Sequence, residues 1–460
     1  MSEYADFLAA KRLQVHEFGP SVETGDINPI LFPFQRDLVK WAIRKGRAAI
    51  WADTGLGKTF MQIEWARLIG ERTLILAPLA VAQQTIREAA RLGVEVGYAH
   101  HQGEATGQFT ISNYERLDRF DPAAFGAVVL DESSILKAFS GVTKRALIEA
   151  FADTKYRLAC TATPAPNDIE ELCNHAHFLG VMKPSEMRST FFIADSRGEF
   201  MRYRLKKHAK AAFYRWLSSW AMAVKKPSDL GYADDGFDLP PLTESVVAVE
   251  TDWAPEGRLW AIDLSGIVER SQVRRSTMTA RVQATADLIA AEPFESWIVW
   301  CGLNDEGRAL ADAIGSGAVV VEGADTADAK ADALLAFADG KTRVLITKST
   351  IAGFGMNFQV CARVAFLGLN DSFEQYYQAV RRCWRFGQTR PVHAYVVVSE
   401  IERTAVYENV MRKQAQAVEL STELIRHAAE YERAELFAGT SAADDFEPRA
   451  EMEVPSWLAA

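Results

Sequence analysis

The chain has few cysteines, and their spacing excludes the common cysteine-based frameworks. It holds 460 residues and five cysteines, none of them in a CxxC pair. An odd number of cysteines without such spacing argues against a disulfide scaffold or a structural zinc site, and it favours a reducing compartment. The sequence therefore predicts a cytoplasmic protein. The five are Cys160, Cys173, Cys301, Cys361 and Cys383.

Long apolar runs and an excess of basic charge are also missing. No apolar run is long enough to span a bilayer, and the first residues, MSEYADFLAAKRLQ, lack the apolar centre of a signal peptide. A hydrophobic content of 48% and 460 residues are enough for two full cores. The net charge of -10 argues against a passive nucleic-acid coat, but a local basic groove can still hold phosphates.

One stretch, from Met201 to Lys226, is basic and aromatic and has no acidic residue. We see two readings for it. The aromatic residues can stack on nucleic acid beside cationic groups, or they can be core residues under a solvated basic face. Its basic residues are Arg202, Arg204, Lys206, Lys207, Lys210, Arg215, Lys225 and Lys226, and its aromatic residues include Phe213, Tyr214, Trp216 and Trp220.

What the chain does have is an alternation of short apolar runs and longer amphipathic segments. This pattern is typical of parallel sheets covered by helices. In the first third we expect strands at 48–51, 73–77, 127–130 and 157–161, with helices at 59–69 and 81–91. The pattern resumes with strands at 297–301, 318–321, 343–347, 363–367 and 392–398, and with helices at 304–314, 327–338 and 373–384.

These segments predict an α/β protein with two lobes of the same class. We expect lobe 1 at residues 1–180, a helical basic insertion and linker at 181–280, and lobe 2 at 281–400. Residues 401–460 should form one or two charged helices, which dock a partner or brace lobe 2, followed by a mobile acidic tail.

A glycine-rich loop follows the first expected strand. Residues 52–59 read Ala-Asp-Thr-Gly-Leu-Gly-Lys-Thr and lead into a helix, which is the order of a P-loop. Backbone N–H groups of such a loop and the helix N-terminus bind phosphate oxygens. Lys58 would contact the β- and γ-phosphates of a nucleotide, and the Thr59 hydroxyl would ligate Mg²⁺. The predicted nucleotide-binding residues of the loop are Asp53, Thr54, Gly55, Leu56, Gly57, Lys58 and Thr59.

Two acids end a later apolar strand. Residues 125–130 are apolar and run into Asp131 and Glu132. At the end of a parallel strand, Asp131 would hold Mg²⁺, and Glu132 would orient or deprotonate the attacking water. Together with the P-loop, the pair predicts ATP hydrolysis with Mg²⁺ as cofactor.

Four further motifs stand in a fixed order around these two. They are LFPFQ at 31–35, LACTATPAPN at 158–167, STIAGFGMN at 349–357 and QYYQAVRRCWRFGQ at 375–388. In this combination the chain resembles the superfamily-two helicases, and among them the Swi/Snf-type DNA translocases, from about residue 32 to residue 412. Small versions of this family occur in bacteriophages and prophages, so the resemblance implies a minimal, bacteriophage-like motor working in a host cytoplasm.

The resemblance implies two RecA-like lobes with ATP between them. Gln35 would read the adenine edge, Gly355 and Asn357 would face the nucleotide, and Gln378 would couple the lobes together with Thr161 and Thr163 of the third motif. Arg381 and Arg385 are four apart, which would place them on one helix face. We expect that face to reach the γ-phosphate, with Arg385 as the arginine finger. The motif after Glu132 departs from the family pattern, with Ser133 and Ser134 in place of Ala-His or Ala-Asp.

The expected partner is nucleic acid, most of all double-stranded DNA. Contacts to its backbone would come from Ser112, Asn113 and Tyr114 in lobe 1 and from Lys348 and Ser349 in lobe 2. The leading hypothesis is a nucleic-acid-dependent ATPase that translocates on duplex DNA. The alternatives are a strand-separating DNA or RNA helicase, a regulatory module that binds nucleotide without hydrolysis, and a P-loop enzyme such as a kinase, which would have no use for the second lobe.

Overall fold

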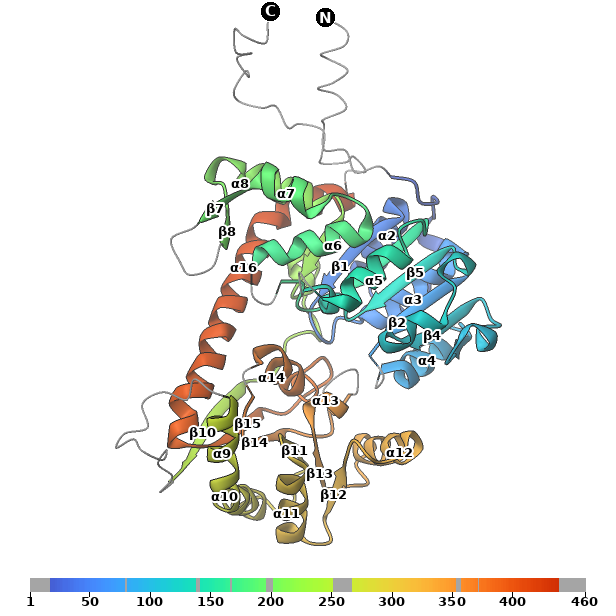
Figure 1. The fold of residues 1–460 in the computed structure, drawn as a ribbon. Coiled ribbons are helices and arrows are strands. Elements are labelled where there is room, and N and C mark those ends of the chain that lie inside the picture. Colours follow the sequence, from blue (N-terminus) through green and yellow to red (C-terminus); the bar gives the residue numbers. More distant parts are fainter. Residues whose placement is uncertain are drawn as a thin grey trace, which may run out of the picture.

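The computed structural model describes residues 17–78, 81–137, 141–165, 168–195, 202–250, 267–352, 357–370 and 372–437. In this part of the chain two parallel sheets form the cores of two RecA-like lobes (Figure 1). The predicted fold class is therefore confirmed. No helix of the described ranges has the length and apolar character needed to cross a membrane.

Lobe 1 is built on a seven-stranded sheet with the order β3-β4-β2-β5-β6-β1-β9. Successive side chains of a strand point to opposite faces of the sheet. The side chains of each strand therefore alternate between two layers of helices. Ile50 packs with α2, α3 and α4 on one face, whereas Trp51 packs with α5, α6 and α8 on the other. The strands are β1 (Arg47–Ala52), β2 (Thr73–Ala77), β3 (Val96–Tyr98), β4 (Phe109–Asn113), β5 (Ala127–Asp131), β6 (Tyr156–Cys160) and β9 (Ala221–Val224).

The helices of lobe 1 are α2 (Pro33–Lys45), α3 (Lys58–Ile69), α4 (Ala82–Arg91), α5 (Val142–Ala150), α6 (Leu172–Leu179), α7 (Pro184–Phe191) and α8 (Lys210–Ser218). A short antiparallel hairpin of β7 (Phe192–Asp195) and β8 (Arg202–Leu205) lies between α7 and α8. Short 3-10 helices connect several of these elements, among them Tyr114–Arg119, Ser133–Lys137 and Ile169–Glu171.

Lobe 2 has a six-stranded parallel sheet with the order β10-β15-β14-β11-β13-β12. One face is covered by α10 and α11, and the other by α12, α14 and the first turns of α16. Its strands are β10 (Leu242–Val249), β11 (Trp297–Cys301), β12 (Ala318–Val321), β13 (Val344–Thr347), β14 (Arg363–Leu367) and β15 (Val392–Ser399). Its helices are α9 (Ile267–Ser276), α10 (Met278–Ala291), α11 (Asn304–Ile314), α12 (Ala327–Ala338), α13 (Ser349–Ala352) and α14 (Phe373–Val380).

The region predicted as a separate insertion is shared between the lobes instead. Strand β9 pairs with β1 at the edge of the first sheet, and β10 pairs with β15 at the edge of the second. The aromatic residues of the basic stretch are core: Phe213, Trp216 and Trp220 are almost fully buried. A strand of four residues such as β9 is too short to be recognised between helical segments from the sequence pattern. The predicted end of lobe 1 at residue 180 was therefore placed too early.

The C-terminal helices do more than extend lobe 2. After α15 (Glu400–Glu402) and a π-helical turn at Arg403–Tyr407, the 30-residue helix α16 (Glu408–Phe437) runs from lobe 2 to lobe 1 (Figure 1). Val410 lies in the core of lobe 2, whereas Leu424 and Ala428 lie in the core of lobe 1. A buried ion pair of 2.8 Å between Lys45 and Glu435 joins its last turns to α2. The helix therefore bridges the two lobes. The predicted acidic tail lies outside the described residues.

Candidate nucleotide site between the lobes

The P-loop connects β1 to α3 at the carboxyl edge of the first sheet. Gly55 and Gly57 take φ values of 92° and 76°, which a residue with a side chain rarely adopts. The Lys58 ammonium donates to the carbonyl oxygens of Ala52 at 2.7 Å and of Asp53 at 3.1 Å. Burial lowers the pKa of Lys58, while the carboxylates of Glu132, Asp53 and Asp131 act against this shift. The Lys58 ammonium is thus held by the backbone of its own loop.

The acidic pair follows β5, two strands away from β1 in the same sheet. The Gln62 amide of α3 donates to the Asp131 carboxylate at 2.9 Å. Burial raises the pKa of Asp131 to about 6, and the neighbouring Glu132 adds to the shift. Glu132 has a φ of 63°, which is uncommon for a residue with a side chain and is found mainly where function requires it. Both acids line the same cavity as Lys58.

Two hydroxyl groups fix the Glu132 carboxylate. Thr161 donates to Glu132 Oε1 at 2.6 Å, and Ser134 donates to the same oxygen at 2.9 Å. The Thr163 amide in turn donates to the Thr161 hydroxyl at 3.0 Å. The third motif is therefore directly linked to the acidic pair, and Ser134, which departs from the family pattern, takes part in that link.

A cavity of about 470 Å³ lies between the lobes, which is the size of a small-molecule site. Its lining joins the P-loop and the acidic pair to residues of lobe 2. Predicted residues that line it are Gln35, Thr54, Gly55, Gly57, Lys58, Thr59, Asp131, Glu132, Asn357, Gln378 and Arg385. Gly355 lies outside the described residues. Leu56 is not part of the lining, but its carbonyl accepts the Gln35 amide at 2.8 Å.

The prediction for the arginines needs one correction. We expected Arg381 and Arg385 on one helix face, but α14 ends at Val380 and the chain turns after it. Arg381 is not among the residues that line the cavity, and it forms an ion pair with Asp53 at 2.7 Å. Arg382 lines the cavity in its place, together with Arg385. Asp53, which we expected to bind nucleotide, is not among the residues that line the cavity either.

Arg382 is buried and Arg385 is half-buried, and both line the same cavity. Burial and the nearby charge of Arg385 lower the pKa of Arg382 to about 9, and burial also lowers the pKa of Arg385. The Gln378 side-chain oxygen accepts from Arg382 at 3.0 Å. Within the described residues, the buried Nε of Arg385 has no hydrogen-bond partner. Two neighbouring guanidinium groups at one cavity are stabilised by an anion placed between them and the P-loop.

Comparison with protein families gives a match within the second lobe. Residues 280–387, which include Arg382 and Arg385, match the helicase conserved C-terminal domain. Among curated proteins none matches the chain. Among solved structures the chain is similar to the SWI2/SNF2 ATPase core of Sulfolobus solfataricus in complex with dsDNA. The two chains are 19% identical, with a TM-score of 0.42. The similarity covers 89% of this chain and 99% of the other.

Part of the cavity lining is apolar and aromatic. Ile30, Phe32 and Phe386 belong to it, and the Phe386 ring of lobe 2 lies edge-on to Phe32, with ring centroids 6.0 Å apart. The Gln35 side-chain oxygen accepts the Phe32 amide at 2.8 Å, so the amide group of Gln35 is fixed at this end. An apolar wall beside a fixed amide is suited to a nucleotide base. Gln35 was predicted to contact the base from its motif, whereas Phe32 and Phe386 were not predicted as part of the site.

The residues that we expected to touch nucleic acid in lobe 1 are buried. Ser112 is 0% exposed, and its hydroxyl donates to the Ala99 carbonyl at 2.7 Å. The Tyr114 hydroxyl donates to the Asp131 carbonyl at 2.7 Å, and Asn113 is also buried. Their positions contradict the predicted contact, because they support the sheet edge from inside. Lys348 and Ser349 of lobe 2 are half-buried at the start of α13, where the Ser349 hydroxyl donates to Gln375 at 3.2 Å.

The side chains present fit Mg²⁺. Thr59 and Asp131 both line the cavity beside the P-loop. The described part of the chain holds no group of three or more His, Cys, Asp or Glu side chains arranged for a metal. One hydroxyl and one carboxylate suit Mg²⁺, which keeps waters and takes further ligands from substrate phosphates. Bound there, Mg²⁺ would neutralise charge that develops on phosphate oxygens.

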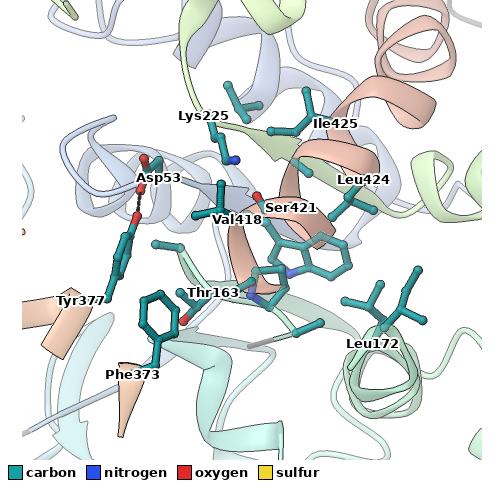
Figure 2. A pocket seen from close by; sticks show the side chains of 18 residues that line it. Asp53, Thr163, Leu172, Lys225, Phe373, Tyr377, Val418, Ser421, Leu424 and Ile425 are labelled. Carbon is teal, nitrogen blue, oxygen red and sulfur yellow. Dashed lines mark hydrogen bonds between the residues drawn. The ribbon is translucent and has the colours of Figure 1, made fainter. Parts of the chain in front are cut away.

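A second, smaller cavity lies behind the P-loop (Figure 2). It measures about 80 Å³ and is mostly apolar. Residues of the third motif, of β9, of α14 and of α16 meet around it, among them Thr163, Val224, Phe373, Val418 and Leu424. Asp53 and Tyr377 stand at its edge and are hydrogen-bonded to one another (Figure 2).

Proposed function

We propose that this protein is a nucleic-acid-dependent ATPase of the helicase class that couples ATP hydrolysis to translocation on double-stranded DNA. The observation that carries the proposal is the meeting of three groups at one cavity. The P-loop lysine and the acidic pair come from lobe 1, and two arginines come from the segment of lobe 2 that matches the helicase C-terminal domain. A kinase or a simple nucleotide-binding module has no need for arginines supplied by a second lobe.

The chain's own residues account for the chemistry. Lys58 and the loop amides bind the phosphates, and Thr59 and Asp131 hold the Mg²⁺ that accompanies ATP. Glu132, held by Thr161 and Ser134, is placed to orient the attacking water and accept its proton. Arg382 and Arg385 stabilise the charge of the transferred phosphoryl group, and they can do so only while the lobes are together.

Preference for duplex DNA is supported by the form of two motifs. Thr-Ala-Thr-Pro at 161–164 and Arg-Phe-Gly-Gln at 385–388 resemble the Swi/Snf type, whose members move on duplex DNA. ATP binding closes the cleft and hydrolysis lets it open, and alternating grip on the phosphate backbone by the two lobes turns this motion into translocation.

A triplex displacement assay tests the proposal. The wild-type protein with ATP should remove a third strand from duplex DNA, and Lys58→Ala should not. A forked duplex in the same assay reports strand separation. Efficient unwinding of the fork without triplex displacement would contradict translocation on duplex DNA and would favour a strand-separating helicase.

A further inference from the structure

Lobe 2 also touches the P-loop directly, at Asp53 and Thr54, beside the nucleotide cavity. The Arg381 guanidinium donates to Asp53 Oδ2 at 2.7 Å and to the Thr54 carbonyl at 2.9 Å, and it also bonds the Thr54 hydroxyl. The Tyr377 hydroxyl donates to Asp53 Oδ1 at 2.7 Å (Figure 2). Two residues of α14 and its C-cap thus bind two consecutive residues of the loop.

The Arg381 side chain is buried in this contact. Arg381 is 4% exposed, and its guanidinium lies over the Trp384 ring, 4.9 Å from the centroid. Burial raises the pKa of Asp53, but the charges of Arg381 and Lys58 and the Tyr377 hydroxyl outweigh it, so the pKa of Asp53 is lowered. A buried carboxylate of this kind stays ionised only while its partners are in place. Asp53 therefore depends on lobe 2.

The same aspartate holds the conformation of the P-loop. Asp53 Oδ1 accepts the Thr54 amide at 2.7 Å, and the Asp53 carbonyl accepts the Lys58 ammonium. Next to it, a Cβ placed on Gly55 would lie 2.8 Å from the backbone nitrogen of Phe386, so lobe 2 packs directly on the loop backbone. A change at Arg381 is transmitted through Asp53 to the groups that bind phosphate.

We propose that Arg381 is a positioning residue for the P-loop, which reaches the loop from lobe 2 and holds Asp53 and Thr54 in the nucleotide-binding conformation when the lobes close. This inference rests on the proposed function. Arg382 lines the nucleotide cavity, whereas its neighbour Arg381 binds Asp53 and Thr54 of the loop. Closure therefore delivers Arg382 to the phosphates and Arg381 to the loop in one movement, so that nucleotide affinity and lobe closure are linked.

A double-mutant cycle on nucleotide binding tests the proposal without requiring hydrolysis. The variants are Arg381→Gln, Asp53→Asn and the two combined, and the probe is a fluorescent ATP analogue with Mg²⁺. We expect each single variant to weaken binding by about tenfold, a typical size for coupled sites. The combined variant should bind no more weakly than the weaker single variant. Arg381→Lys, which keeps the charge, should recover part of the affinity, and kcat should change less than KM.

Glu374→Gln is the matched control. Glu374 lies on the same helix and forms an ion pair with Lys137 of lobe 1, away from the P-loop. It should weaken binding of the analogue less than Arg381→Gln does, because it removes a contact between the lobes that does not involve Asp53 or Thr54. Equal losses in Glu374→Gln and Arg381→Gln would overturn the proposal, as would single-variant losses that multiply in the combined variant.

Two further variants keep the test decisive if Arg381→Gln fails to fold. Tyr377→Phe removes one hydroxyl, and Arg381→Lys keeps the charge. Unchanged affinity in both would overturn the positioning role. A wild-type protein that neither binds nor hydrolyses ATP would instead refute the proposed function, so the two failures are distinguishable.

Discussion

The two sides of the P-loop differ in how their charged groups are satisfied. On the cavity side, Arg385 keeps a buried donor without a partner among the described residues, and Asp131 lies in a place that raises its pKa to about 6. At the contact with lobe 2, Arg381 and Asp53 are paired with each other and with Thr54 and Tyr377. The cavity side therefore keeps charged groups that can bind a ligand, whereas the pairs around Asp53 hold the loop.

Removing a cavity arginine should give the largest effect. Arg385→Ala and Arg382→Ala should each lower kcat by about 10³-fold or more, because the charge on the transferred phosphoryl group loses a partner. Steady-state ATP hydrolysis measures this. Arg390→Ala is the control, since Arg390 follows the same segment but pairs with Glu295 at the surface. An equal loss in Arg390→Ala would mean that the cavity arginines have no special role.

Replacing the held carboxylate should separate binding from turnover. Glu132→Gln keeps the shape of the side chain and its contacts with Thr161 and Ser134, but it can no longer accept a proton. We expect hydrolysis to fall by roughly 10²–10⁴-fold, with affinity for a fluorescent ATP analogue close to that of the wild type. Binding and hydrolysis measured on the same preparation decide the matter. Loss of both in proportion would assign Glu132 a structural role only.

Breaking a paired charge away from the cavity should affect stability and not catalysis. Lys45 and Glu435 are both fully buried. Lys45→Met should destabilise the protein by about 3 kcal/mol, because it leaves a buried carboxylate without its main partner. Lys45→Met combined with Glu435→Leu should recover most of that loss. Urea unfolding measures the difference, with the exposed Glu430→Gln as the control. Equal stability of Lys45→Met and wild type would contradict the docking of α16 on α2.

A smaller effect should come from a buried histidine. His175 accepts or donates one hydrogen bond of 3.1 Å with Ser133 and lies edge-on to Trp51. Burial lowers its pKa to about 4. The unfolded chain then binds the proton first, so this stability is present above pH 6.5 and is lost as the pH falls toward 4. Between pH 7.5 and pH 5 the loss from this group is about 2 kcal/mol.

Urea unfolding of the wild type and of His175→Asn at both pH values measures that loss. The variant should lose less stability on acidification than the wild type. The same pH dependence in both proteins would show that His175 is not the group responsible.

Much of the fold could be predicted from local pattern, because buried parallel strands are continuous apolar runs. Strands β2, β11, β12 and β14 begin and end at the predicted residues. The P-loop and the acidic pair were also predicted, since each depends on a few adjacent residues. The position of β9 was not, because a strand of four residues acquires its place only through pairing with β1.

The arginines show the limit of the same reasoning. Spacing placed Arg381 and Arg385 on one face, but this holds only while the helix continues, and α14 ends at Val380. Arg382 was overlooked for that reason. The burial of Ser112 and Tyr114 could not be read from their types, since polar residues at a sheet edge serve as internal supports as well as binding groups. The bridge formed by α16 depends on contacts hundreds of residues apart, which periodicity does not contain.

The most direct test is ATP hydrolysis by the purified protein without nucleic acid and with duplex DNA, single-stranded DNA or RNA, with Lys58→Ala as the blank. Hydrolysis that duplex DNA stimulates most, and that Lys58→Ala lacks, is the result we predict. Hydrolysis stimulated by single strands or RNA but not by duplex, or no hydrolysis under any of these conditions, would contradict a duplex-driven motor.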